Sequence, residues 1–296
     1  MYWMKNLDGS RHLYEIVMPG SHDAALYNIT KTSFFTEPGA VKTQELTVAK
    51  QLDAGCRFFD FRVYSRHGQL WLGHFAEVFG PGHGDFGGLG PSLSTVLNDV
   101  RTFLEREDNE ETVIIRFSHV SDEQTERVVD EIVANIPSSL RYKPTTDEPL
   151  ALVTLRELRG KVVMAFAENF APFYSNEEGI LPFYEYGHGH CGLITCGHHP
   201  KTRRYSKMKR DQEIQKEHHS HHRDNREHFF VLHWTMTGGN VKNTSEPAIK
   251  GLYGDLCHNM LEKAEFAMKT DDPMPNIVLM DFVDAAHCAP IIEMNF

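Results

Sequence analysis

Residue types that can move protons and bind a phosphate gather in the first quarter of the chain. His22 and Asp23 follow the sequence Pro-Gly-Ser. Asp60 and Arg62 lie two residues apart further on, and His74 comes shortly after them. Two imidazoles, one guanidinium and two carboxylates in this arrangement are the groups that cleavage of a phosphodiester requires.

The chemistry explains each of these residue types. When a neighbouring sugar hydroxyl attacks a phosphodiester, a base must take the proton of the hydroxyl and an acid must protonate the leaving alcohol. Imidazoles titrate near neutral pH, so two histidines can serve in both roles. Negative charge grows on the non-bridging phosphate oxygens, and a guanidinium such as that of Arg62 offers a rigid fork of donors that matches them.

The elements that must position these residues are predicted to be the strands of a barrel. Apolar runs rich in β-branched and aromatic residues alternate with helical patterns, which is typical of a parallel α/β barrel or a doubly wound sheet. We expect a single distorted (β/α)8 barrel of the TIM type over residues 1–296, because this length is usual for one such domain. Barrel enzymes keep their chemistry at strand ends, where His22 and Arg62 fall. The candidate strands are residues 14–18, 56–64, 69–74, 112–118, 161–167, 192–196, 229–235 and 276–283.

Apolar periodicity also predicts helices between these strands. Residues 93–104 form one apolar helical face. Ser121 with Gln124 resembles a capping box that opens a second helix, and Pro247 opens a third. The inward residues of the second helix are predicted to be Val128, Ile132 and Ile136.

Several motifs taken together resemble the X-box of the phosphatidylinositol-specific phospholipases C. They are Gly-Ser-His-Asp at 20–23, Thr-Gln at 43–44, a twelve-residue run from Gln51 to Arg62, and Asn-Ile-Val-Leu-Met-Asp-Phe-Val at 276–283. The last of these is similar to the final barrel strand of that family. The resemblance is strongest over residues 15–118, and its ordered set of motifs is highly specific.

The resemblance implies catalytic roles for these residues. His22 would be the general base, oriented by Asp281, and His74 the general acid, oriented by Asp23. The reaction would release diacylglycerol and a cyclic inositol phosphate from a phosphatidylinositol-like lipid.

Asp60 lies two residues before Arg62 and therefore on the same strand face, where it would hold that arginine or a histidine. Each group alone also has a simpler interpretation. His22 and Asp23 could form a surface hydrogen bond, Asp60 and Arg62 a plain ion pair, and Asp281 a cap after its strand. A phosphodiesterase site is favoured because all of these residues occur together, in the sequence order that the family has.

The identity of the second histidine has two candidates. The family usually has Gly after this histidine, which His67-Gly68 matches literally, whereas Phe75 follows His74. We prefer His74, because His67 lies in a predicted hairpin turn while residues 71–74 read as the next strand.

No cofactor is expected, and calcium is not expected either. In the calcium-dependent branch of the family, acids occupy the position of Arg62 and one near Ser118, where calcium would take its oxygen ligands. An arginine can supply the same positive charge, so the chain is similar to the metal-independent branch.

Two alternative functions stay open. One is a metal-dependent barrel enzyme of the glycerophosphodiesterase or sphingomyelinase D kind, and the other is a catalytically silent X-domain that binds lipid or a protein partner.

Recognition of the head group is where the chain departs from the family. The positions of the family's lysine and arginine fall at Ser118 or His119 and at 167–168, where this chain has Ala and Glu. We take Ser118, His119 and Trp234 as substrate-binding candidates. Phe34 and Phe35 could anchor the protein in a membrane interface, although buried loop aromatics are equally common.

Other polar clusters have weaker interpretations. His and Cys residues between 188 and 199 have metal-binding types but fit no zinc spacing, so we expect an unliganded loop. The charged, His-rich segment 203–228 is predicted to be the solvated part of an outer helix. The glycine-rich run 80–84 has no following Gly-Lys-Ser/Thr and is interpreted as a flexible lid.

Composition restricts the partners. The 296 residues are 41% hydrophobic and carry a formal net charge of −11, which argues against nucleic acid and against a broadly basic membrane-binding face. We therefore expect a phospholipid substrate and only transient, local, peripheral membrane contact, with the oligomeric state open. No run of about 18 apolar residues exists. The odd number of cysteines, five, and the polar start of the chain favour a cytoplasmic location, or a secreted one if a signal peptide has been removed.

Overall fold

Eight parallel strands close into a barrel in the computed structural model. The model describes residues 1–33, 36–77, 85–120, 122–186, 191–220, 226–236 and 274–296. The strand order is β1, β11, β10, β9, β8, β7, β6, β3, and β3 pairs again with β1, so the sheet has no open edge along this circuit. The strands are β1 (Met18–Ser21), β3 (Phe58–Arg66), β6 (Val113–Val120), β7 (Val162–Phe166), β8 (Ile180–Glu185), β9 (Leu193–Cys196), β10 (Phe229–Trp234) and β11 (Ile277–Met280).

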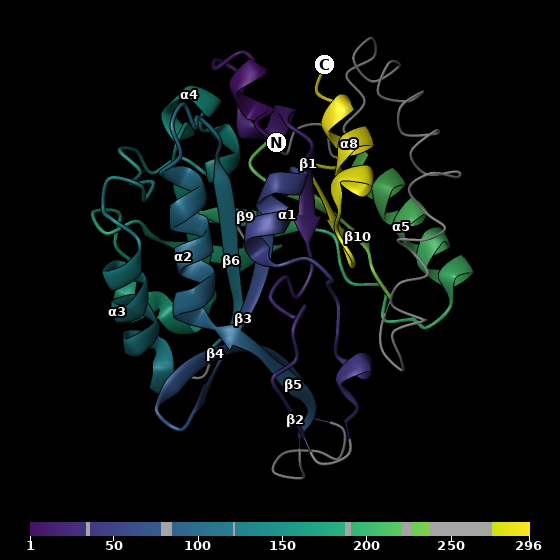
Figure 1. Ribbon diagram of the computed structural model, residues 1–296. Helices are drawn as coiled ribbons and strands as arrows, with labels where there is room; N and C mark the ends of the chain where they lie inside the picture. The colour runs from purple at the N-terminus through teal and green to yellow at the C-terminus, as the bar shows by residue number, and fades with distance from the viewer. Residues whose placement is uncertain (34–35, 78–84, 121, 187–190, 221–225, 237–273) are drawn as a thin grey trace.

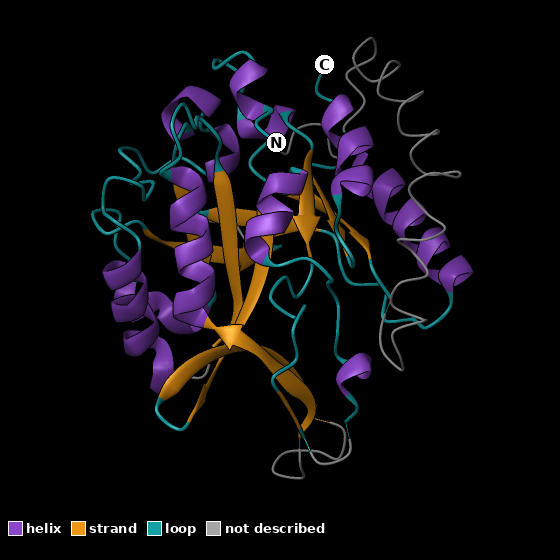
Figure 2. Ribbon diagram, viewed as in Figure 1, coloured by secondary structure: helices purple, strands orange, loops and turns teal. Residues whose placement is uncertain are grey.

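Helices surround the strands, as Figure 2 shows. Helix α2 buries an apolar face and is capped by Ser92, whose Oγ accepts a hydrogen bond from the backbone N–H of Thr95. In the described part of the chain no helix combines the length and apolar character that a membrane crossing requires. The α-helices are α1 (Val48–Ala54), α2 (Leu93–Leu104), α3 (Thr125–Asn135), α4 (Leu155–Leu158), α5 (Tyr205–Ser220) and α8 (Ala285–Glu293).

An antiparallel extension lies at the end of the barrel opposite the two chain termini (Figure 1). It consists of β4 (Gln69–Glu77), β5 (Asp85–Ser92) and β2 (Lys31–Thr32), and it continues from β3 through β4. Because β3 runs past the barrel into this hairpin, a residue on β4 can reach back over the carboxyl ends of the parallel strands.

The strand entering the site passes close to its neighbours. A Cβ on Gly20 would lie 2.9 Å from Cγ2 of Ile277 and 3.4 Å from a ring carbon of Phe58, so only glycine fits here without displacement. Gly20 therefore brings β1 into contact with both β11 and β3, and it does so two residues before His22.

A buried ion pair ties together the amino-terminal end of the barrel. Nε of Arg57 donates to Glu111 at 2.8 Å, and neither side chain is exposed to solvent. Arg57 also donates to the backbone carbonyls of Leu52 and Cys56. The pair thus joins the start of β3, the end of α1 and the segment before β6 at the face remote from the histidines.

The barrel predicted from the sequence is confirmed, with corrections to its strands. The predicted strand at 14–18 is wrong, because Leu13–Glu15 form a 3₁₀ turn and β1 begins only at Met18. The run at 69–74 is a strand but pairs antiparallel to β3, outside the barrel. The strand that completes the barrel is β8, which the sequence analysis did not identify because its run Ile-Leu-Pro-Phe-Tyr-Glu contains a proline.

The helix predictions have mixed outcomes. The face within 93–104 is confirmed as α2, and the inward residues of the second helix are buried. That helix begins at Thr125, after a 3₁₀ turn at Asp122–Gln124. The predicted capping box depends on Ser121 and is therefore not described. Ser121 and the helix expected at Pro247 lie outside the described residues.

We predict that Glu111→Ala destabilises the fold far more than Glu110→Ala. Loss of Glu111 leaves the buried charge of Arg57 unpaired, which typically costs about 3–5 kcal/mol. Glu110 is the matched control, because it is adjacent, pairs with Arg159 at 2.7 Å and is half exposed, so its loss should cost about 0–1 kcal/mol. Urea unfolding followed by circular dichroism measures both, and equal losses would contradict this account.

Candidate active site

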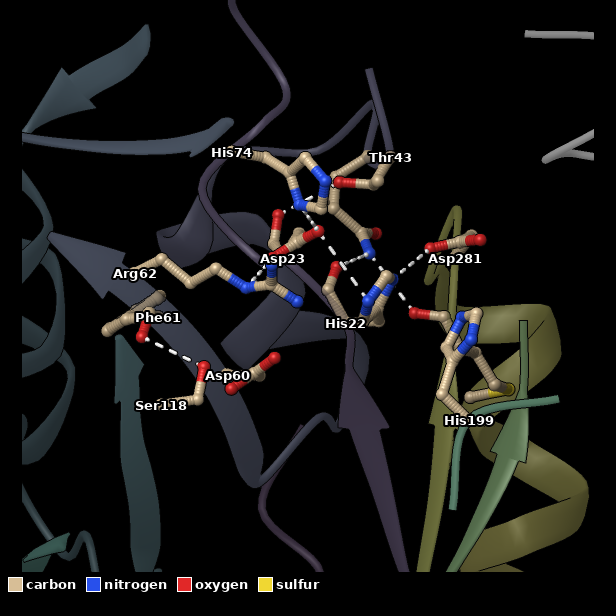
Figure 3. A network of polar contacts seen from close by, with 12 residues as sticks. His22, Asp23, Thr43, Asp60, Phe61, Arg62, His74, Ser118, His199 and Asp281 are labelled. Atoms are coloured by element: carbon tan, nitrogen blue, oxygen red, sulfur yellow. Dashed lines mark hydrogen bonds and ion pairs between the residues drawn. The ribbon is translucent and has the colours of Figure 1, made fainter. Parts of the chain in front are cut away.

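The predicted catalytic residues converge at the carboxyl ends of the barrel strands (Figure 3). His22 comes directly after β1, Asp281 directly after β11, and Arg62 lies on β3. His74 enters from β4 of the antiparallel extension. Residues separated by as many as 259 positions therefore meet in one place because the barrel closes between β1, β3 and β11.

The first imidazole is held by a carboxylate from the neighbouring strand. Nδ1 of His22 lies 2.9 Å from Oδ1 of Asp281, and its Nε2 lies 3.5 Å from Oδ2 of Asp23. Because Nδ1 is engaged by Asp281, Nε2 is the nitrogen that can exchange a proton with a substrate.

A glutamine amide fixes the two loops that carry this pair. Nε2 of Gln44 donates to the backbone carbonyls of His22 at 2.9 Å and Met280 at 3.1 Å. Its Oε1 accepts from the backbone N–H of Val283 at 2.9 Å. This explains the glutamine of the Thr-Gln motif, because the buried side chain of Gln44 holds the ends of β1 and β11 together.

Asp23 contacts two further residues that are predicted to be catalytic. Its Oδ2 lies 2.7 Å from Nδ1 of His74, and its Oδ1 forms an ion pair with Nε of Arg62 at 3.1 Å. The backbone of Asp23 has φ 40°, in the left-handed region, which aspartate tolerates better than most residues. Thr43 holds this conformation by donating from Oγ1 to the carbonyl of Asp23 at 2.9 Å.

Asp60 has a different partner from the one expected. Its Oδ1 accepts from Nε of Arg116, on the adjacent strand β6, at 2.9 Å, and both side chains are almost completely buried. The prediction that Asp60 would hold Arg62 or a histidine directly is therefore wrong. The register pairs Asp60 with Arg116 at the same level of the barrel, one layer below Arg62.

The ionisation of the site follows from these contacts. Burial disfavours the charged form of His22, but the carboxylates of Asp23 and Asp281 outweigh it and raise its pKa to about 9. Burial would raise the pKa of Asp23, but Arg62 and both histidines hold it well below its usual range. Asp281 keeps a raised pKa, because burial outweighs the attraction of His22.

The structure adds a histidine to the site that sequence reasoning assigned to a loop. The ring centroid of His199 lies 5.7 Å from that of His22. Burial, together with the positive charge of His22, lowers the pKa of His199 to about 3, so this imidazole is neutral where its neighbour is charged. Its position three residues after Cys196, where β9 ends, was the available sign, since the carboxyl ends of barrel strands carry the site.

The predicted head-group residues have separate outcomes. His119 lies near enough to Arg62 and His74 for their charges to act on it, and its ring is tilted against that of Tyr64, with 5.5 Å between centroids. Ser118 donates to the carbonyl of Phe61 (Figure 3). Trp234 is corrected, because it is buried on the outer side of the barrel against Tyr205 of α5, 6.0 Å between centroids. A tryptophan covered by this helix is not among the residues that face a substrate.

Other predictions fall on the surface or outside the described residues. His67, the alternative to His74, has φ 52° and is exposed in the turn between β3 and β4, where the hairpin turn was predicted. The segment 203–228 contains the outer helix α5, as predicted. The residues predicted to contact a membrane, Phe34 and Phe35, and those predicted to form a lid, 80–84, lie outside the described residues.

One group of side chains could hold a cation. Ligand atoms of His22, Asp23 and Asp60 all lie within 4.8 Å of one another. The donor set is poor for a divalent ion, however, because Asp23 already pairs with Arg62 and Asp60 with Arg116, and these two guanidinium charges would repel it.

The chain is similar to curated and solved proteins of one family. The 1-phosphatidylinositol phosphodiesterase of Listeria monocytogenes is 27% identical over 168 residues, and that of Staphylococcus aureus (strain Newman) is 28% identical over 169. These matches cover 55% of this chain and 47% and 49% of the relatives, so the chain spans about half the length of the curated relatives it matches.

Solved structures share the fold over the whole chain. The phosphatidylinositol-specific phospholipase C of Listeria monocytogenes has a TM-score of 0.64 at 21% identity, covering 100% of this chain and 98% of that one. A Staphylococcus aureus phosphatidylinositol-specific phospholipase C has a TM-score of 0.68 at 20% identity, with 100% and 97% covered. The family model described as "Phosphatidylinositol-specific phospholipase C, X domain" matches residues 18–166, half of the chain, a range that contains His22, Arg62 and His74. The chain therefore belongs to the phosphatidylinositol-specific phospholipase C X-domain family.

Proposed function

We propose that this protein is a phosphodiesterase of the phospholipase C type, which cleaves phosphatidylinositol-like lipids through attack of a head-group hydroxyl on its own phosphate. The observation that carries the proposal is the pair of imidazole–carboxylate contacts, His22 with Asp281 and His74 with Asp23, gathered around Arg62. Curated relatives named 1-phosphatidylinositol phosphodiesterase support the choice of substrate class.

The geometry supports a division of the proton transfers between the two histidines. Nδ1 of each histidine faces its carboxylate, so Nε2 of each is left for the substrate. The neutral form of His22, a minority at pH 7 because its pKa is raised to about 9, takes the proton of the attacking hydroxyl at Nε2. His74 gives a proton to the glycerol oxygen as its bond to phosphorus breaks. The products are diacylglycerol and a five-membered cyclic phosphodiester of the head group.

Arg62 stabilises the charge that develops on the phosphate. Its Nε is engaged by Asp23, while its terminal nitrogens form no hydrogen bond to any described residue and 27% of the side chain is exposed. A phosphate oxygen can therefore accept hydrogen bonds from these nitrogens, in the orientation that Asp23 imposes. We propose that this charge, with that of Arg116 behind it, makes a divalent metal unnecessary.

The substrate is a lipid, so the protein must meet a membrane surface at least transiently. A solved structure of the similar Staphylococcus aureus enzyme concerns modulation of its membrane binding. The net charge of −11 gives no general attraction to anionic lipid, so we propose a small, local contact.

We predict that His74→Ala abolishes nearly all activity, whereas His67→Ala has a mild effect. Loss of a positioned acid typically costs about 100- to 10,000-fold in rate. His67 is the matched control, because it is exposed in the turn next to the same strand. Both variants are assayed on phosphatidylinositol in detergent micelles, and a severe loss in His67→Ala beside a mild loss in His74→Ala would reassign the acid.

We predict that turnover survives chelation. Purified protein is incubated in excess EDTA with a panel of phospholipids labelled in the head group, and the water-soluble product is identified for each. Phosphatidylinositol should be cleaved at the same rate with and without EDTA, because Arg62 supplies the positive charge. Loss of turnover in EDTA and its return with calcium or magnesium would favour the metal-dependent alternative through His22, Asp23 and Asp60.

We predict that two neighbouring imidazoles titrate at opposite extremes. The pKa of about 9 keeps His22 protonated at pH 7, while the pKa of about 3 keeps His199 neutral. Two-dimensional ¹⁵N–¹H NMR of the histidine rings over pH 4–10 should show the titration of His22 and a His199 ring that stays neutral throughout, with assignments from His199→Gln and Asp281→Asn. Asp281→Asn should lower the pKa of His22, since one of its two carboxylates is lost; no shift would contradict the assigned pairing.

A further inference from the structure

His233 lies inside the barrel, one layer below the residues that are proposed to be catalytic. On β10, His233 is level with Leu279 of β11. Leu279 is two residues before Asp281, and alternate residues of a strand point to the same side. Because Asp281 reaches His22 inside the barrel mouth, the side chain of His233 also faces the interior, one layer deeper.

His233 is a buried polar group that lacks a partner. Only 8% of the residue is exposed, and its Nδ1 has no hydrogen-bond partner among the described residues. Oγ1 of Thr235, which lies at the level of Asp281, is also buried and has no hydrogen-bond partner among the described residues. Such atoms are rare in folded proteins, and they point to a ligand or water that the protein is built to hold.

The position of His233 connects it to the catalytic base. Its ring centroid lies 6.0 Å from that of His199, which in turn lies 5.7 Å from that of His22. The three imidazoles therefore form a row that descends from the place of the phosphate into the barrel.

Arg116 faces the same interior space. It lies over the rings of Phe58 and Phe183, at 5.6 and 5.2 Å from their centroids. Only its Nε is engaged, by Asp60, and its terminal nitrogens form no hydrogen bond within the described residues. Burial and the charge of Arg116 hold the pKa of His233 well below its usual range, so this imidazole stays neutral.

We propose that His233 and Arg116 form the floor of the head-group pocket and select head groups that carry several hydroxyls beyond the one that attacks. This inference rests on the proposed function of the same site. A neutral imidazole and a guanidinium can together accept from and donate to ring hydroxyls. The charge of Arg116 is balanced by Asp60, so the floor suits an uncharged polyol ring better than an anionic group.

The expected consequence is discrimination between polyol and simple diol head groups. A site that hydrogen-bonds a substrate hydroxyl rejects an analogue without it, because the buried polar atoms are then left unpaired. Phosphatidylglycerol is the suitable analogue, since it has a hydroxyl next to the phosphate ester and can form a cyclic product, but has no ring.

The test compares kcat/KM for phosphatidylinositol and phosphatidylglycerol in identical detergent micelles. His233→Leu should lower the value for phosphatidylinositol by about 10- to 100-fold and leave phosphatidylglycerol nearly unchanged. His233→Asn, whose amide reaches the position of Nδ1, should restore most of the loss. His12→Leu is the control, because His12 is partly exposed and remote from the site. Equal losses on both lipids, or none, would overturn the proposal.

A binding measurement separates this inference from the proposed function. Saturation-transfer NMR follows free myo-inositol and trans-1,2-cyclohexanediol with His74→Ala and with His74→Ala/His233→Leu, so no turnover is needed. The single variant should bind inositol in preference to the diol, and the double variant should lose that preference. Equal inositol binding by both variants, or binding by neither, would overturn the head-group floor. Inositol binding that requires His233 in a wild-type protein that cleaves neither lipid would uphold the floor and refute the proposed reaction.

Discussion

The site depends on the buried carboxylate of Asp23. Burial of this negative charge would destabilise the fold if no positive charge compensated it. It receives that compensation from three strands: His22 on the segment after β1, Arg62 on β3 and His74 on β4. The left-handed backbone of Asp23 directs the carboxylate to all three, and the close approach of strands at Gly20 makes the geometry attainable. Removal of the barrel closure would separate these groups, so the fold and the chemistry share a single constraint.

Charges alternate through the mouth of the barrel in stacked pairs. Asp281 pairs with His22 at the rim, Asp23 with Arg62 and His74 beside it, and Asp60 with Arg116 one layer below. Each acid is thereby engaged by a fixed cation or an imidazole, which leaves little room for a divalent ion and places two guanidiniums near the phosphate. The same arrangement separates a charged catalytic imidazole from the neutral His199 and His233 behind it.

The sequence was sufficient to predict the barrel and the convergence of most of the proposed site residues at its mouth, because strand-like runs and the X-box motifs indicate both. His22, Asp23 and Asp281 stand at strand ends, where hydrophobic runs stop, and the preference for His74 over His67 followed from reading a turn. Strand β8 was not predicted, because a proline within its sequence argues against a strand. Sequence reasoning did not place Arg116, His199 and His233 near the site, because strand register and barrel closure alone bring them close to Asp60 and His22, and no local pattern encodes these. Trp234 was misplaced for the same reason, since alternation along β10 turns it outward.

The central claim is that the attacking group belongs to the substrate, with His22 as its base. Phosphorus NMR of early reaction mixtures tests this directly on two lipids, phosphatidylinositol and its analogue methylated on the hydroxyl next to the phosphate. The account predicts that a five-membered cyclic phosphodiester is the first phosphorus-containing product of the natural lipid, and that the methylated lipid is not cleaved. A phosphomonoester formed without a cyclic precursor, or cleavage of the methylated lipid, would contradict it by showing direct attack of water.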